Sequence, residues 1–291
     1  MIVVFDSNVW LTELGLRSGA AAAAKFFLNH NGARLALPEV VRLEVQHNLQ
    51  ARLTEHIDTI QSNYRQLLTA FGKLREVVLP SHDDVQAKIQ DLFDSVEVPK
   101  LEIPFSLESA RSSYLKTIDK VPPSDKTQEF KDGVIWADCV ALLSNEPVVL
   151  VTSDKAFYQD RVYEKGLASN LQAEIKDLPH ALRLVSNLSA LLLALRTPVK
   201  IEEGTLAQAF LTAYRDSIYG TLARQGFELG SRRALTCTLF ATENPTVLFL
   251  EFSMAYECTD IRGDGRTDAV LLLKGDGSYM PTTGGFPPAS D

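Results

Sequence analysis

Acidic residues stand at four points where the chain could bring them into one site. Asp6 ends an apolar run over residues 2–5, and Asp154 follows a similar run over residues 148–151. Uninterrupted apolar runs of this length are typical of strands buried on both faces, as in a parallel sheet. A carboxylate at the carboxyl end of such a strand lies at the edge where open α/β sheets bind ligands. The alternative for Asp6 is that it only caps the segment that follows.

Glu44 and Asp132 extend this acidic group. Glu44 lies in the first turns of a helix that follows a short predicted strand over residues 34–37, so it shares the same edge. Asp132 begins a helix that precedes a strand, so it must approach that edge by another route. Four carboxylates meeting there would repel one another and raise one another's pKa values unless cations lay between them. The sequence therefore predicts bound Mg²⁺ or Mn²⁺, hard ions that prefer oxygen ligands and promote in-line phosphoryl chemistry by activating water.

Two neighbours of Asp132 on the predicted helix over residues 131–143 have other expected roles. Asp138 lies six residues on, which at 100° per residue places it about 120° away from the Asp132 face. We interpret it as a supporting or surface residue rather than a metal ligand. Trp136 shares the face of Asp132, and we expect it to pack in the core.

The helix that contains Glu44 is unusually long. It begins at Pro38, and apolar residues recur at spacings of three and four from Val41 to Leu74, which indicates a sustained helical seam. Unbroken, it would span about 50 Å at 1.5 Å per residue. A second amphipathic helix over residues 83–96 could pack back on it as a helical hairpin.

Basic side chains lie on the other faces of this long helix. Arg42, His47 and Arg52 lie within a few turns of Glu44. One interpretation is a solvated helix surface. The other is a groove wall that contacts a phosphate backbone.

The remaining segments alternate between helical and extended patterns. Helices are predicted over residues 20–28 and 106–118, and a last helix that Ser186 or Asn187 caps ends at Leu195. Residues 98–104 are predicted to be extended, and residues 182–185 to form a further strand. Strands that alternate with helices indicate βα units and an α/β fold with a parallel sheet.

A different pattern follows a boundary at Thr197-Pro198. A helix over residues 206–227 precedes three predicted strands, at residues 234–240, 247–256 and 269–273. This order indicates a small α+β domain. Residues 281–291, rich in Pro, Gly, Ser and Thr, are predicted to be disordered. The acidic loop over residues 260–268 does not have the spacing of a calcium-binding EF-hand loop, so we interpret it as a turn.

Composition narrows the classes of protein that this chain could be. No apolar run is long enough for a membrane span, and no signal peptide is recognisable. Three cysteines without a CxxC pair argue against a zinc site and favour a reducing compartment, so we expect a cytoplasmic protein. The net charge of −8 gives no general attraction to nucleic acid, so such contacts would need local basic faces or metal ions.

The acidic positions lie in four ordered motifs, at residues 5–8, 37–45, 131–136 and 150–157. These motifs resemble those of PIN-domain nucleases, and the resemblance covers roughly residues 1–195. It implies a Rossmann-like αβα sandwich and divalent-metal-dependent cleavage of RNA, less often of DNA. By position, Asp6, Glu44, Asp132 and Asp154 match the acidic quartet of the family. Further positions match its small polar residues that orient ligands or water, and these are Ser7, Asn8 and Ser153.

The chain differs from compact toxin-like PIN proteins in two respects. A helical insertion is expected at about residues 46–118 of a nuclease domain over residues 1–196, and a C-terminal α+β domain over residues 199–280 follows. In this it resembles larger, uncharacterised bacterial members of the family. The resemblance is compatible with a homodimer and with a protein partner bound through the C-terminal domain, and it leaves open the RNA target and a toxin or defence role.

The main hypothesis from the sequence is a metal-dependent endoribonuclease. Asp6, Glu44, Asp132 and Asp154 would hold the ions, and Arg42, His47 and Arg52 would contact RNA. A second hypothesis is a catalytically weak PIN-like nucleic-acid-binding or scaffold module. A third is a phosphatase of another Rossmann-like class whose Asp nucleophile ends the first strand. Asn8, where such enzymes have a second Asp, weighs against the third.

Overall fold

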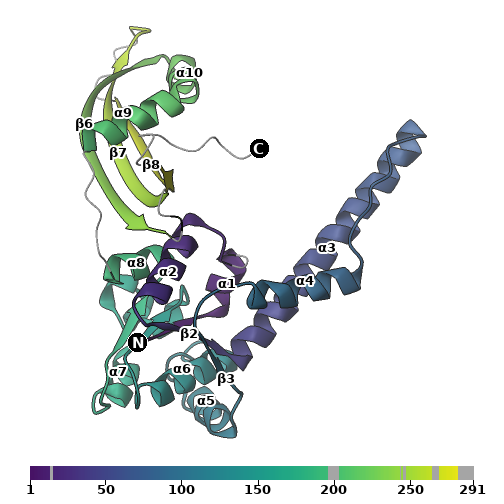
Figure 1. The fold of residues 1–291 in the computed structure, drawn as a ribbon, viewed down its shortest axis with the longest axis vertical. Coiled ribbons are helices and arrows are strands. Elements are labelled where there is room, and N and C mark those ends of the chain that lie inside the picture. Colours follow the sequence, from purple (N-terminus) through teal and green to yellow (C-terminus); the bar gives the residue numbers. More distant parts are fainter. Residues whose placement is uncertain (14–15, 196–202, 243, 245–246, 264–268, 281–291) are drawn as a thin grey trace. The chain divides into compact units, whose positions relative to one another are not determined.

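A computed structural model describes residues 1–13, 16–195, 203–242, 244, 247–263 and 269–280. The chain forms two compact units (Figure 1). The first contains Met1–Arg17 and Leu28–Leu191, and the second contains Ser18–Phe27 and Leu192–Asp291. The predicted boundary at Thr197-Pro198 and the predicted disordered tail over residues 281–291 lie outside the described residues, as does most of the predicted turn over residues 260–268.

The first unit is built on a five-stranded parallel sheet with the strand order β3-β2-β1-β4-β5. The strands are β1 (Ile2–Phe5), β2 (Arg34–Pro38), β3 (Lys100–Ile103), β4 (Val148–Val151) and β5 (Leu182–Val185). Every residue of β1 and β4 is buried, as expected for neighbouring strands at the centre of a sheet covered on both faces.

Helices flank this sheet. Those within the first unit are α1 (Ser7–Glu13), α3 (Glu39–Phe71), α4 (His82–Asp94), α5 (Leu107–Asp119), α6 (Phe130–Leu142) and α7 (Ser169–Ile175), whereas α2 (Gly19–His30) and α8 (Leu188–Leu195) are each divided between the two units. The predicted PIN-like α/β class with a central parallel sheet is therefore confirmed.

Some elements differ from the sequence prediction. Helices α1 and α7, of seven residues each, were not predicted because they are too short to show a helical period. Residues 98–104 were predicted only to be extended, but β3 pairs in parallel with β2 at the sheet edge. The range of about 46–118 predicted as a helical insertion therefore also contains a sheet strand and helix α5. The hairpin itself consists of α3, α4 and the segment that joins them.

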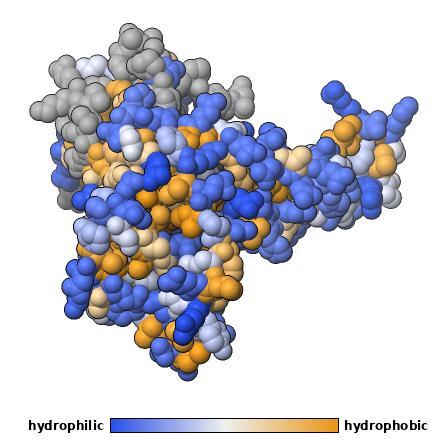
Figure 2. Space-filling view, turned by 60° about the horizontal axis from the view of Figure 1, so that its bottom comes forward, coloured by the Kyte–Doolittle hydropathy of each residue, from blue (hydrophilic) through white to orange (hydrophobic). Residues whose placement is uncertain are grey.

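Helix α3 has a buried base and an exposed outer part. Val41, Val45 and Leu49 are buried near its start, where α4 packs against it. The 33 residues of α3 agree with the predicted long helix. Gly72, with φ 79°, ends the helix, whereas the predicted apolar seam continued to Leu74. The outer part projects beyond α4 (Figure 1). Figure 2 shows apolar side chains among hydrophilic ones near its far end, where Leu67 and Phe71 are exposed.

Helices α5 and α6 pack closely because α6 has a glycine at their contact. A Cβ on Gly133 would lie 2.3 Å from Ser113 Oγ and 3.0 Å from Ser113 Cα. At another point of the same contact, Ser109 Oγ of α5 donates a 2.6 Å hydrogen bond to Asp138 Oδ1 of α6. Asp138 thus bonds to α5 and is buried, so the surface position that the sequence allowed for it is wrong. Trp136 is fully buried, also as predicted.

The second unit has a three-stranded antiparallel sheet of strand order β6-β7-β8. Its elements are α9 (Glu203–Ala213), α10 (Arg215–Gln225), β6 (Phe227–Ala241), β7 (Leu248–Asp260) and β8 (Ala269–Tyr279). Leu206 of α9 packs against Leu239 and Leu250 of the sheet. The helix predicted over residues 206–227 is two helices because the backbone breaks at Tyr214, with φ −111°. Among the described residues, no helix is long and apolar enough to cross a membrane.

The close α5–α6 contact can be tested with Gly133→Ala. The added methyl group meets the backbone of Ser113, which a side-chain rotation cannot relieve. We expect a loss of about 1–3 kcal/mol in the free energy of unfolding, typical of overpacking, despite the better helix propensity of alanine. Calorimetric melting would measure it. The matched control is Gly220→Ala, where no atom lies within 4 Å of the new Cβ and a gain of up to ~1 kcal/mol is expected. Equal melting of wild type and Gly133→Ala would contradict this account.

Candidate functional site

The acidic site lies where the order of the sheet reverses. From β1 the chain proceeds to β2 and β3 on one side, whereas β4 and β5 lie on the other side. The boundary between β1 and β4 is therefore the topological switch point, where open α/β sheets bind ligands beyond the carboxyl ends of the strands. Asp6 directly follows β1, and Asp154 follows β4 after two residues.

Asp6 is a buried carboxylate that several donors hold in place. Its Oδ1 accepts hydrogen bonds from Ser7 N at 2.6 Å and from Ser7 Oγ at 3.3 Å. Its Oδ2 accepts from Asn8 Nδ2 and from Thr152 Oγ1, each at 2.6 Å. Burial raises the pKa of Asp6; the bonds from Thr152 and Ser7 counteract this, whereas Asp154 and Glu44 raise it further. The side chain is thus oriented rigidly toward other negative charges.

Asn8 and Thr152 join the ends of β1 and β4. Asn8 Oδ1 accepts a hydrogen bond from Ser153 N at 3.3 Å, and Thr152 Oγ1 accepts one from Asp154 N at 2.9 Å. The predicted supporting roles of Ser7, Asn8 and Ser153 are compatible with these contacts. Thr152 is fully buried at the end of β4 and was not predicted as a site residue.

Asp154 is fixed at the start of the segment that follows β4. Its Oδ1 accepts a 2.7 Å hydrogen bond from Ala156 N and so caps the 3₁₀ turn η1 (Lys155–Phe157). Two tyrosines brace the backbone before it, since Tyr158 Oη donates to Thr152 O at 3.0 Å and Tyr163 Oη donates to Ser153 O at 2.8 Å. The second carboxylate oxygen of Asp154 is therefore presented by a rigid turn.

Asp132 reaches the same place from the first turn of α6. It is buried, and its Oδ2 has no hydrogen-bond donor among the described residues. Burial, followed by the charges of Asp6, Asp154 and Glu129, raises the pKa of Asp132 to about 8. A proton on Asp132 can be shared with Asp154. Without a cation this carboxyl is therefore largely protonated at neutral pH.

Glu44 is close enough to Asp6 to raise its pKa, but it has a cationic partner. Lys131 Nζ forms an ion pair with Glu44 Oε1. Lys131 directly precedes Asp132, so the pair joins the start of α6 to the second turn of α3. The structure thus brings Asp6, Asp132 and Asp154 within electrostatic reach of one another and places Glu44 within reach of Asp6. Lys131 was not predicted to take part.

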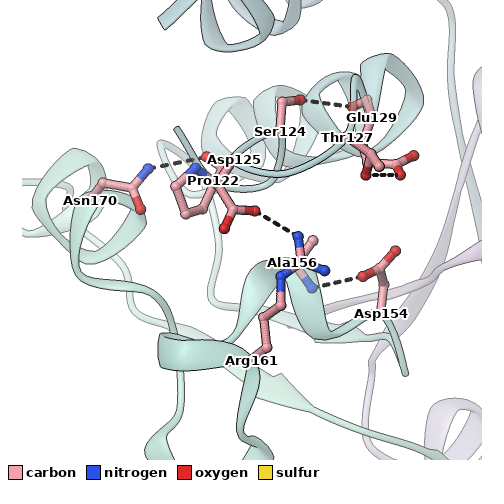
Figure 3. A network of polar contacts seen from close by, with 9 residues as sticks. All are labelled: Pro122, Ser124, Asp125, Thr127, Glu129, Asp154, Ala156, Arg161 and Asn170. Atoms are coloured by element: carbon pink, nitrogen blue, oxygen red, sulfur yellow. Dashed lines mark hydrogen bonds and ion pairs between the residues drawn. The ribbon is translucent and has the colours of Figure 1, made fainter. Parts of the chain in front are cut away.

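Two loops beside the site are tied together (Figure 3). The loop before α6 and the loop after β4 are joined by the ion pair between Arg161 Nη2 and Asp125 Oδ1, at 2.7 Å. Asn170 Nδ2 adds a 3.1 Å hydrogen bond to Pro122 O. Asp160 and Arg161 have φ values of 53° and 60°, uncommon for residues with side chains. These contacts hold the segments that present Asp132 and Asp154.

The three predicted RNA contacts lie on different sides of α3. At 100° per residue, Arg42 is about 160° around the helix from Glu44, whereas His47 is about 60° and Arg52 about 80° away. Arg42 Nη2 lies 4.0 Å from Glu39 Oε1. His47 and Arg52 are exposed. His47 and Arg52 therefore lie nearer to the Glu44 side of the helix than Arg42 does.

The residues present fit a divalent cation. Their ligand atoms are all carboxylate oxygens, the neighbouring charges raise the pKa of Asp6 and of Asp132, and one buried oxygen of Asp132 has no donor. Mg²⁺ and Mn²⁺ prefer such oxygens. Over the part of the chain that the structure describes, no three acidic, His or Cys side chains are already spaced to hold an ion. Ion binding would therefore require Asp132 to lose its proton and Glu44 to turn from Lys131.

Comparison with known proteins gave one match. A family model described as PIN domain matches residues 3–157, which is more than half of the chain and includes all four acidic positions. No curated protein matches the chain. No solved structure matches it either.

The raised pKa of Asp132 predicts how stability without metal depends on pH. Because the pKa is raised from 3.8 to about 8 in the folded state, that state binds the proton more tightly, so stability falls as pH rises from about 4 to 8 and is flat above. Asp132→Asn removes this penalty. We expect it to raise the free energy of unfolding at pH 8 by at least ~1.4 kcal/mol, the equivalent of one pKa unit, with little change at pH 4. Melting in chelator across this range would measure both; parallel curves for the two proteins would contradict the raised pKa.

Proposed function

This chain belongs to the PIN-domain family, whose members are generally nucleases, and from that premise we propose that it is a divalent-metal-dependent endoribonuclease. The observation that supports the proposal best is the meeting of Asp6, Asp132 and Asp154 at the β1–β4 switch point, with Glu44 beside them. Clustered acidic side chains with raised pKa values are costly to stability unless a ligand uses them. A bound cation would offset the repulsion among these carboxylates and would also give a partner to the oxygen of Asp132 that has no donor.

Each acidic residue would have a distinct part in holding the ion. Asp6 is oriented by Ser7, Asn8 and Thr152 and needs little rearrangement. Asp154 presents its second oxygen from the capped turn. Asp132 would release its proton when the ion arrives. A bound divalent ion would activate water and stabilise the leaving oxygen of a phosphodiester.

Lys131 would change partner during substrate binding. In the structure its ammonium group neutralises Glu44. When Glu44 turns toward an ion, the ammonium group is released beside the acidic site. A phosphodiester entering an acidic site needs a cation at its border, and Lys131 is placed to supply one.

The same ion pair is the observation that favours the alternative function. A lysine that already neutralises Glu44 is compatible with a PIN-like module that binds nucleic acid or protein without cutting. Titration calorimetry with Mn²⁺ distinguishes the two functions, because the nuclease requires metal binding and this module does not. The phosphatase alternative has no support from the family match.

The proposed activity is tested by cleavage of RNA. We expect purified protein to cut single-stranded RNA with Mn²⁺ or Mg²⁺ and to stop in chelator. Asp132→Asn should lower the rate by about 100-fold or more, since even residues outside the direct ligands cost 10–100-fold. Added Mn²⁺ should also raise the Tm of the wild type.

The matched control for this test is Asp138→Asn. Asp138 is a buried aspartate on the same helix, and asparagine can still accept the bond from Ser109. It should keep near wild-type activity. Cleavage by Asp132→Asn at the wild-type rate would refute the proposal, and so would unchanged melting at saturating Mn²⁺.

RNA contact by the basic face of α3 is tested by salt dependence. On an Asp132→Asn background, Arg52→Ala should weaken RNA binding and lower the slope of log affinity against log salt by about one. Lys88→Ala, which removes one exposed charge on α4, should leave the slope unchanged. Equal affinities and slopes for Arg52→Ala and its parent would mean that this face is only solvated.

A further inference from the structure

Large apolar side chains are exposed beside the acidic site. Phe105 follows the edge strand β3 and is 45% exposed, whereas Phe130 opens α6 and is 38% exposed. Leu43, directly before Glu44, is 52% exposed. The carboxyl ends of parallel strands and the starts of the following helices share one edge of a sheet, so Phe105 and Leu43 lie at the edge that holds Asp6 and Asp154. Exposed apolar groups gathered at one place indicate a binding surface.

The backbones of both phenylalanines are fixed. Phe105 N donates a 2.8 Å hydrogen bond to Glu39 Oε2, which ties the end of β3 to the first turn of α3. Phe130 O accepts a 2.5 Å hydrogen bond from Ser113 Oγ, which ties the start of α6 to α5. A ring on a fixed backbone loses little conformational freedom when it contacts a ligand.

Phe130 is also close in sequence to two charged residues of the site. The next two residues are Lys131, which forms the ion pair with Glu44, and Asp132. One turn of α6 therefore presents an aromatic ring, a cation and a carboxylate of the site. An aromatic face next to a phosphate-binding cation is the combination that single-stranded nucleic acid uses, because every unpaired base has a face to stack and a phosphate beside it.

We propose that Phe130 and Phe105 are stacking platforms for unpaired bases of a single strand bound at this edge of the sheet. This inference rests on the proposed nuclease function and assigns two base-binding residues to it. In a duplex the base faces are already stacked and cannot reach these rings. Stacking on an aromatic side chain strengthens binding by about tenfold per base.

A protein partner is the other occupant that exposed apolar groups could fit. The centres of protein interfaces are depleted of charged residues. Phe130 instead adjoins Lys131 and the acidic quartet, which favours a charged, planar ligand. The outward face of α5 also exposes large apolar side chains, which are Leu107, Tyr114 and Ile118. None of the four acidic residues lies on α5.

The experiment compares oligonucleotides that differ only in their bases. Binding is measured on the Asp132→Asn background with a single-stranded RNA, with the same backbone lacking bases, and with a duplex. Phe130→Ala should weaken binding of the single strand about tenfold, Phe105→Ala should weaken it less or equally, and neither should change binding of the baseless strand. Phe130→Trp should restore affinity. The matched control is Phe71→Ala, an exposed phenylalanine at the far end of α3, which should bind like the parent.

Other results would overturn the stacking inference or the proposed nuclease function, and the experiment separates the two. Equal loss on the baseless strand would mean that Phe130 acts through the fold or the phosphate contact, and stronger binding of the duplex would exclude unpaired bases. A lower solution mass of Phe130→Ala with unchanged RNA affinity would make the surface a protein contact. If the wild type cuts no RNA with Mn²⁺ but the affinity pattern holds, the nuclease proposal fails and base stacking stands. If the wild type cuts RNA and Phe130→Ala on the Asp132→Asn background binds as tightly as that background alone, only the stacking proposal fails.

Discussion

Repulsion among buried carboxylates at the β1–β4 switch point is the constraint on which the first unit depends. Burial alone raises the pKa of Asp6 and Asp132, and each neighbouring charge raises it further. The fold must therefore supply enough stability elsewhere to keep these groups together. The fully buried strands β1 and β4 supply part of it through apolar burial, and the bonds from Ser7, Asn8 and Thr152 keep Asp6 from turning away.

The helices that present the other two acidic residues are positioned by contacts far from the chemistry. Asp132 lies on α6, and α5 can approach α6 closely only because Gly133 has no side chain to meet Ser113. Glu44 lies near the buried base of α3, where α4 packs. The ion pair between Arg161 and Asp125 then joins the loops next to Asp132 and Asp154. Small displacements of these elements would change the spacing of the acidic oxygens, so their packing helps to determine the geometry of the site.

The sequence predicted those parts of the site that local patterns determine. Uninterrupted apolar runs predicted β1 and β4, and a carboxylate after each run predicted Asp6 and Asp154. The bond of Thr152 to Asp6 and the ion pair of Lys131 with Glu44 join residues 146 and 87 positions apart, so no local pattern could indicate them. Strand β3 was missed for a similar reason: its pairing with β2 lies across the whole hairpin. Arg42, His47 and Arg52 were predicted together because they lie within a few turns of Glu44, but at 100° per residue the helix separates Arg42 from the other two.

Charge balance explains how the site can exist before an ion binds. Four carboxylates would carry four negative charges, but a proton on Asp132 and the ammonium group of Lys131 on Glu44 remove two of them. One proton and one ammonium group together supply the charge of one divalent ion. Binding of one divalent ion would therefore replace two positive charges by two others, because Asp132 would lose its proton and Lys131 would leave Glu44. The net charge of the site would change little. Because the released ammonium group would remain beside Phe130 and Asp132, the proposed loading of the site with an ion would also prepare its border for a phosphodiester.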